Sequence, residues 1–122
     1  MKKSIFSLAI LSLFSGVYAT DNQELCSIGD AISCYVVAEQ YHEGKGAKKD
    51  LNKALVLHRR NCDEREFLLS CISSKDIFKN KGDAAGEKKY ETKAKAMAKR
   101  QCEEGNEDSC EWENLFKTFW HE

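Results

Sequence analysis

The chain has 122 residues, of which 42% are hydrophobic and 32% are charged, and its formal net charge at pH 7 is −1. A chain of this length forms one domain, and an acidic balance argues against nucleic-acid binding. There is no proline, β-branched runs are few, and polar helix formers are common, so the composition predicts an all-α fold.

Residues 1–19 have the features of a secretory signal peptide. Two lysines follow the first Met, residues 5–14 are mostly apolar, and Val17-Tyr18-Ala19 matches a small-x-small cleavage site. About ten apolar residues are too few to cross a bilayer. We predict cleavage after Ala19, a product of residues 20–122 with a net charge of −3, and a periplasmic or secreted protein without a stable membrane anchor.

The first complete helix is predicted over about residues 30–42, because residues 20–25 are too few for a helix of their own. Apolar side chains then recur at positions i, i+3, i+4 and i+7, which indicates one buried helix face. Residues 43–49 form a loop whose two glycines permit positive φ angles. This loop lacks the Lys-Ser/Thr ending and the preceding strand of a phosphate-binding P-loop, so we interpret it as a structural turn. The buried face consists of Cys34, Val37, Ala38 and Tyr41.

The second helix is predicted over about residues 51–62, with Asp50 as its N-cap. His58 lies on its apolar face, together with Leu51, Ala54 and Cys62. We predict that His58 is packed or hydrogen-bonded in the core, and the alternative is a ligand or a general base.

The third and fourth helices are predicted over about residues 66–79 and up to Cys102, joined by a loop at 80–83. Gly86 leaves the start of the fourth helix open. The fourth helix carries a row of basic residues that we interpret as a solvated face, with binding to an anionic surface as the alternative. The row consists of Lys88, Lys89, Lys93, Lys95, Lys99 and Arg100.

The last helix is predicted over about residues 106–120, and it carries the most apolar stripe after the signal peptide. Two interpretations remain open: the stripe closes the core, or it is a docking face for a protein partner, since aromatic residues dominate interface energetics. The candidate partner-binding residues are Trp112, Phe116, Phe119 and Trp120.

The six cysteines form three close pairs, and the first members of the pairs lie 36 and 40 residues apart. A cysteine pair that recurs at this period indicates a repeat of helix pairs. Cysteines eight residues apart on one helix would be separated by about 12 Å, whereas a disulfide needs Cα atoms about 4.4–6.8 Å apart. The chain must therefore reverse within each pair, and the predicted disulfides are Cys26-Cys34, Cys62-Cys71 and Cys102-Cys110.

The turns differ among the three pairs, because the first and third pairs enclose a glycine and the middle pair does not. An even cysteine count after a signal peptide fits an oxidising compartment. Zinc is the alternative, but it needs close sets such as C-x2-C, and His42, His58 and His121 are scattered along the sequence. We predict no metal, no cofactor and no catalytic residue.

Residues 34–62 resemble the Sel1-like repeat, a relative of the tetratricopeptide repeat. A second, degenerate unit at 71–102 keeps Phe78 in place of Tyr41, but it loses the Gly-x-Gly loop. With the cysteine spacing and the export signal, the chain resembles the cysteine-rich Sel1-like proteins of the Helicobacter and Campylobacter group. The matching residues are Ala38, Tyr41, Gly44, Gly46, Ala47, Asp50, Lys53-Ala54 and Leu57.

The resemblance implies a short α/α solenoid of antiparallel helix pairs stapled by disulfides, with repeats at about 30–62 and 66–102. Such stacks present a concave surface that binds other proteins, so we predict a protein–protein interaction module that is a monomer or small oligomer. It would act as a periplasmic adaptor, an inhibitor or a host-interaction factor. An inhibitor or immunity-type protein is a variant of this prediction.

The alternative function is an enzyme, because the family resemblance also implies penicillin-binding or β-lactamase-like proteins. Serine β-lactamases use Ser-x-x-Lys and Lys-Thr-Gly. Here Ser73-Ser74-Lys75 and Lys117-Thr118-Phe119 only approach these motifs, so the residues favour the interaction module.

Overall fold

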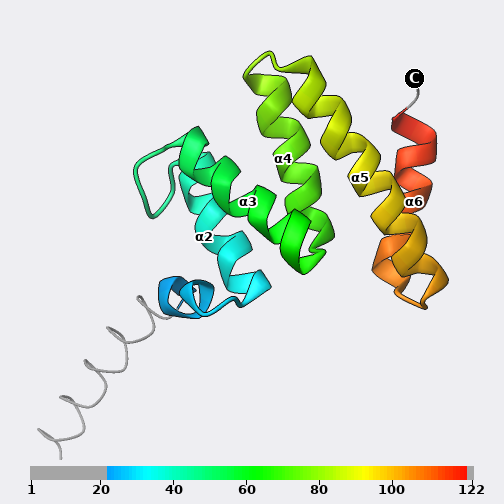
Figure 1. Cartoon of the computed structure of the whole chain (residues 1–122), viewed down its shortest axis with the longest axis horizontal. Helices are drawn as coiled ribbons and strands as arrows, with labels where there is room; N and C mark the ends of the chain where they lie inside the picture. The colour runs from blue at the N-terminus through cyan, green and yellow to red at the C-terminus, as the bar shows by residue number, and fades with distance from the viewer. Residues whose placement is uncertain (1–21, 121–122) are drawn as a thin grey trace, which may run out of the picture.

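A computed structural model describes residues 22–120, and the predicted signal peptide, its cleavage site and His121 lie outside the described residues. The described part is helical, which confirms the all-α prediction. A helical segment at 22–27 precedes the five helices α2 (Ala31–Glu43), α3 (Leu51–Arg65), α4 (Leu68–Asn80), α5 (Ala84–Glu103) and α6 (Glu107–Phe119) (Figure 1).

Each helix packs mainly against its immediate neighbours along the chain. In Figure 1, α2 and α3 form one pair, α4 and α5 form a second pair beside it, and α6 lies against α5 at the C-terminal end. Within residues 22–120, no helix is both long enough and apolar enough to cross a bilayer.

Four of these helices start at an Asp or Asn whose side chain accepts a hydrogen bond from the backbone N–H three residues later. Such caps satisfy amides that have no partner within the helix. The cap predicted at Asp50 is confirmed, and a cap at Asp83 fixes the start of α5 that the sequence left open. Phe67 precedes α4 without a side-chain cap.

All three predicted disulfides are confirmed, and they use all six cysteines. Each one joins the end of one helix to the first turns of the next, and the loops that they close could each contribute about 2–3 kcal/mol. The Cα–Cα distances are 4.4 Å for Cys26-Cys34, 4.8 Å for Cys62-Cys71 and 4.6 Å for Cys102-Cys110.

The turn inside the middle pair is made by Glu66, which adopts a left-handed conformation with φ of 53°. The second helix was predicted to end near Cys62, but α3 continues to Arg65 because the chain reverses only at Glu66. A non-glycine residue in this conformation costs roughly 1–2 kcal/mol. The adjacent disulfide and a hydrogen bond of 2.9 Å from Gln101 Nε2 to the Glu66 carbonyl oxygen hold it there.

Residues 20–25 were predicted to be too few for a helix of their own, but residues 22–27 are helical. Gly29 (φ 97°) ends this segment, and the Asp30 N–H donates to the Leu25 carbonyl oxygen at 2.9 Å. The Cys26-Cys34 disulfide fixes the segment to α2.

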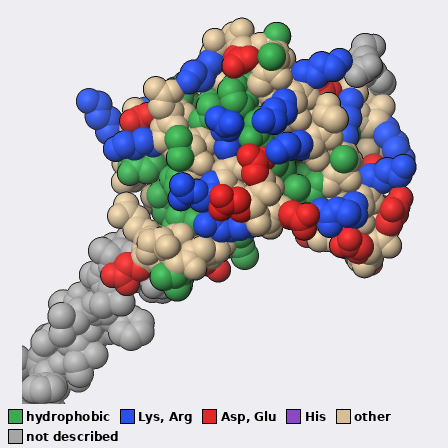
Figure 2. All heavy atoms as spheres, viewed as in Figure 1, with side chains coloured by type: hydrophobic (Ala, Val, Ile, Leu, Met, Phe, Trp, Pro, Cys, Tyr) green, Lys and Arg blue, Asp and Glu red, His purple; other side chains and the backbone are tan. Residues whose placement is uncertain are grey.

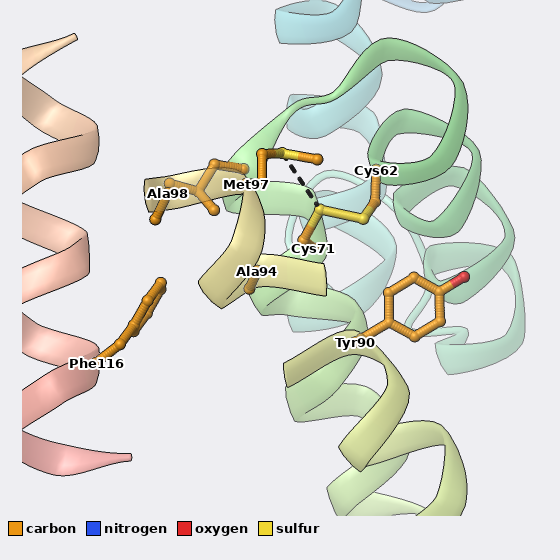
Figure 3. Packing of buried hydrophobic residues seen from close by; sticks show 8 residues of the cluster. Cys62, Cys71, Tyr90, Ala94, Met97, Ala98 and Phe116 are labelled. Carbon is orange, nitrogen blue, oxygen red and sulfur yellow. Dashed lines mark hydrogen bonds between the residues drawn. A yellow bond between two sulfur atoms is a disulfide. The ribbon is translucent and has the colours of Figure 1, made fainter. Parts of the chain in front are cut away.

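The larger core cluster lies between α3, α4, α5 and α6, and a smaller one lies between α3 and α4 with Tyr41 of α2 beside it. Phe78 of α4 packs against both clusters. Its ring explains Gly86 in the first turn of α5, because a Cβ atom there would lie 2.4 Å from the ring. The buried members of the larger cluster are Cys62, Leu68, Cys71, Tyr90, Ala94, Met97, Ala98 and Phe116 (Figure 3).

Candidate functional site

The aromatic stripe of α6 is divided between the core and the surface. Phe116 is only 3% exposed and points toward Ala94 and Ala98 of α5 (Figure 3), whereas Phe119 is 72% exposed. Trp112 and Trp120 are half-buried, and the ring of Trp120 stacks on Phe116 with 4.0 Å between centroids. Phe116 therefore belongs to the core, as the first interpretation of the stripe predicts, whereas the ring of Phe119 is exposed on the surface.

A shallow hollow of about 310 Å³ lies between α5 and α6, next to this stripe. Phe116 and Trp120 give it an apolar lining, and three lysines give it a basic one. Two of these lysines are already paired within their helix, with Nζ–Oε1 distances of 3.2 Å for Lys95-Glu91 and 2.7 Å for Lys117-Glu113. The lining residues are Lys95, Lys99, Glu113, Phe116, Lys117 and Trp120.

Lys75 of α4 contacts the C-terminal end of the aromatic stripe of α6. Its side chain is nearly buried, and its Nζ atom lies 4.1 Å from the centroid of the Trp120 ring. An ammonium over an indole ring is a cation–π contact that strengthens as water is excluded. Sequence analysis missed this contact, because it joins residues from α4 and the end of α6 that no local pattern relates.

The basic row on α5 is only partly a solvated face. Lys93 pairs with Asp63 of α3, and Arg100 Nη2 lies 3.0 Å from Glu66 Oε1, so both residues also link helices. Figure 2 shows Lys and Arg side chains spread over this face, with acidic side chains gathered near the end of α5. The interpretation of this row as simply solvated is therefore incomplete.

His58 is fully buried, and its Nδ1 atom lies 3.1 Å from Ser70 Oγ, so the prediction of a packed, hydrogen-bonded histidine is confirmed. Its Nε2 atom lies 3.0 Å from Glu39 Oε1, and Ser73 Oγ donates to the same carboxylate oxygen at 2.9 Å. The contact with His58 is the main reason that the pKa of Glu39 falls to about 2, against the opposing effect of burial. These contacts join α2, α3 and α4.

His58 lies between a serine and a glutamate, as the histidine of a Ser-His-Glu triad does. However, Ser70 is fully buried, and its Oγ atom also accepts a hydrogen bond from Asn61 Nδ2 at 3.0 Å. A catalytic serine has to reach its substrate, so we assign Ser70 a structural role. The near match to Ser-x-x-Lys is also used structurally, because Ser73 bonds to Glu39 and Lys75 contacts Trp120.

Comparisons with protein-family models, with curated proteins and with solved structures found no match to this chain. The Sel1-like family therefore stays a prediction that depends on the residues quoted above. Sequence analysis also missed the grouping of Glu39, His42 and His58 around one point. The i, i+3 spacing of Glu39 and His42 was the available signal, since such residues share one helix face.

Proposed function

We propose that this protein is an exported protein–protein interaction module built as a short, disulfide-stapled α/α solenoid of the Sel1-like type. Three features support the proposal: helices that pack on their neighbours in chain order, disulfides that recur at similar intervals, and a sequence that begins like a signal peptide. The disulfides favour the periplasm or the exterior of the cell, where thiols oxidise.

The observation that carries the proposal is the composition of the α5–α6 face. Phe119 and Leu115 are 72% and 44% exposed, and they lie on the same helix as residues lining the basic hollow. A large exposed apolar side chain beside lysines suits a partner that supplies an apolar anchor flanked by carboxylates. We therefore propose that the partner is a protein with an acidic segment containing an aromatic or leucine residue.

The charge of the hollow supports an acidic partner even though the whole chain is acidic. Lys99 is exposed and has no ion pair with any residue in 22–120, so its charge is available. Glu113 is neutralised by Lys117. Local positive potential steers a negative segment toward the face and weakens as salt rises.

A selection from a random peptide library against the oxidised protein would test this function. We expect enriched peptides to share acidic residues around one aromatic or leucine residue. Lys99→Glu should weaken their binding at least tenfold at low salt, and the difference should shrink at high salt. Phe119→Ala should also weaken binding about tenfold, because it removes the contact with the anchor.

Matched controls are available elsewhere on the surface. Lys48→Glu changes an exposed lysine in the 43–49 loop, and Val56→Ala truncates an apolar side chain of α3 that is 56% exposed. Both variants should bind the selected peptides as tightly as the native protein. Equal losses in the controls, or enriched peptides without acidic residues, would contradict the proposal.

A further inference from the structure

Three side chains from two helices converge between α2 and α3. Glu39 and His42 lie one turn apart on α2, and His58 faces them from α3. Glu39 Oε1 lies 3.0 Å from His58 Nε2 and 3.7 Å from His42 Nδ1. One donor atom from each of the three residues lies within 4.8 Å of the other two.

His42 Nδ1 and His58 Nε2, the two nitrogens that face Glu39, are buried. Among the residues that the structure describes, neither atom meets the geometric conditions of a hydrogen bond. His58 Nε2 lies at an ion-pair distance of 3.0 Å from Glu39 Oε1, whereas His42 Nδ1 lies 3.7 Å from the same oxygen, too far for a hydrogen bond. Most buried polar atoms are hydrogen-bonded, and an exception calls for an explanation such as an ion.

We infer that Glu39, His42 and His58 form a binding site for a divalent first-row transition-metal ion, with Zn²⁺ as the best match. Zinc binds imidazole nitrogen and carboxylate oxygen at about 2.0–2.2 Å in tetrahedral geometry, which places ligand atoms roughly 3.3–3.5 Å apart. The observed separations of 3.0 and 3.7 Å lie on either side of this value. Two histidines and one carboxylate leave the fourth position for water.

Hydrogen bonds with two serines of α4 hold His58 and Glu39 in fixed orientations. Ser70 Oγ lies 3.1 Å from His58 Nδ1, and when Nδ1 carries the proton and donates it there, the lone pair of Nε2 is free for a metal. Ser73 Oγ donates to Glu39 Oε1 at 2.9 Å and fixes the carboxylate. Outer hydrogen bonds of this kind are a regular feature of metal sites.

One side of the group borders solvent, and the other side packs against an aromatic ring. The side chains of Glu39 and His42 are 23% and 22% exposed, so this side of the group borders solvent. On the inner side, the ring of Tyr35 packs edge-on against His58 with 5.5 Å between centroids. Partial exclusion of water strengthens the attraction between a cation and the Glu39 carboxylate. This inference does not depend on the proposed protein-binding function.

The test is a Zn²⁺ titration of the full-length, oxidised protein, purified without a polyhistidine tag and stripped of metal. Isothermal titration calorimetry should show one equivalent of Zn²⁺, and Zn²⁺ should raise the melting temperature, because the ion binds only the folded arrangement. Co²⁺, used as a spectroscopic probe, should give the visible absorption of a tetrahedral site.

His42→Ala is the main variant, because it removes one ligand without breaking a hydrogen bond, and it should weaken Zn²⁺ binding at least tenfold. Glu39→Gln should do the same, and it keeps the shape of the side chain if the first variant fails to fold. The matched controls His121→Ala and Glu43→Gln should bind Zn²⁺ like the native protein. No saturable binding at millimolar Zn²⁺, or equal affinity in His42→Ala and His121→Ala, would overturn the inference.

Discussion

The interior of the α2–α4 region combines a small apolar cluster with a buried network of hydrogen bonds, whereas the interior of the α4–α6 region is mainly apolar. In the first region, Asn61 Nδ2 donates to the Ala31 carbonyl oxygen at 2.8 Å and to Ser70 Oγ at 3.0 Å, and Asn61 Oδ1 accepts from Arg65 Nη1 at 3.0 Å. The second region is filled by Tyr90, Ala94, Met97, Ala98 and Phe116.

The two interiors differ in how they hold the helices. Hydrogen bonds are directional, so the polar region sets the orientation of α2 on α3 and α4, and removing one group leaves its partners unsatisfied. Apolar packing contributes in proportion to buried area and is less sensitive to direction. The following predictions use this difference, from the largest expected effect to the smallest.

Loss of the central disulfide should have the largest effect. Cys62 and Cys71 are almost fully buried in the larger core cluster, and their disulfide joins the two helix pairs. Cys62→Ala with Cys71→Ala should lower the free energy of unfolding by about 3–4 kcal/mol in urea denaturation, because the lost packing of two buried sulfur atoms adds about 1 kcal/mol to the roughly 2–3 kcal/mol of the closed loop. Cys26→Ala with Cys34→Ala should cost less, because it frees only the short 22–27 segment, and a larger loss there would contradict the proposed difference.

Truncation of Phe116 should show the importance of the apolar region. Phe116→Ala should lower the free energy of unfolding by about 3 kcal/mol, because it leaves a cavity against α5. Phe119→Ala on the same helix should change it by less than about 0.5 kcal/mol, since that ring is 72% exposed. Similar losses in the two variants would mean that the whole stripe belongs to the core.

Replacement of Asn61 should test the polar region. Asn61→Ala should cost about 2 kcal/mol in the same assay, because Ser70 and the Ala31 carbonyl oxygen lose their buried donor. Asn52→Ala provides an exposed control on α3, where only a surface contact with Lys81 is lost. If both variants are equally stable, the hydrogen bonds of Asn61 do not stabilise the fold.

Gly86→Ala should test the point where the two regions meet. Alanine is the better helix former by about 1 kcal/mol, but its Cβ atom would lie 2.4 Å from the ring of Phe78, which packs against both clusters. We expect a net loss of about 1 kcal/mol. The companion change Gly86→Ala with Phe78→Leu should recover the helix-forming gain if the ring is the cause.

Stability should also depend on pH through Glu39. Its pKa is about 2 in the folded protein, below its ordinary value of 4.5, so the unfolded chain takes up the proton first as pH falls. The resulting stabilisation is complete above about pH 5 and is lost toward pH 2. In the presence of a chelator, Glu39→Gln should reduce this loss, whereas Glu43→Gln should leave it unchanged. Identical pH profiles for the two variants would contradict the assignment to Glu39.

Much of the fold follows from the sequence alone, because the signals are local. Apolar spacing placed the helices, Asp50 marked a cap, and the cysteine spacing predicted all three disulfides, since a pair eight residues apart can close only around a chain reversal. The end of α3 was predicted too early, near Cys62 instead of Arg65, because the left-handed turn at Glu66 contains no glycine that would indicate it. For the α6 stripe, the sequence listed the right residues without separating core from surface.

Only the tertiary structure decided which distant residues meet. The packing of α4 and α6 on α5 brings Lys75 over Trp120, and the packing of α2 on α3 brings His42 and Glu39 to His58. Periodicity and capping act within a few residues, so they fix each helix and the face that it buries. Contacts between helices depend on the angle at which the helices pack. That angle is set by side chains that are far apart in the sequence, so no short stretch encodes it.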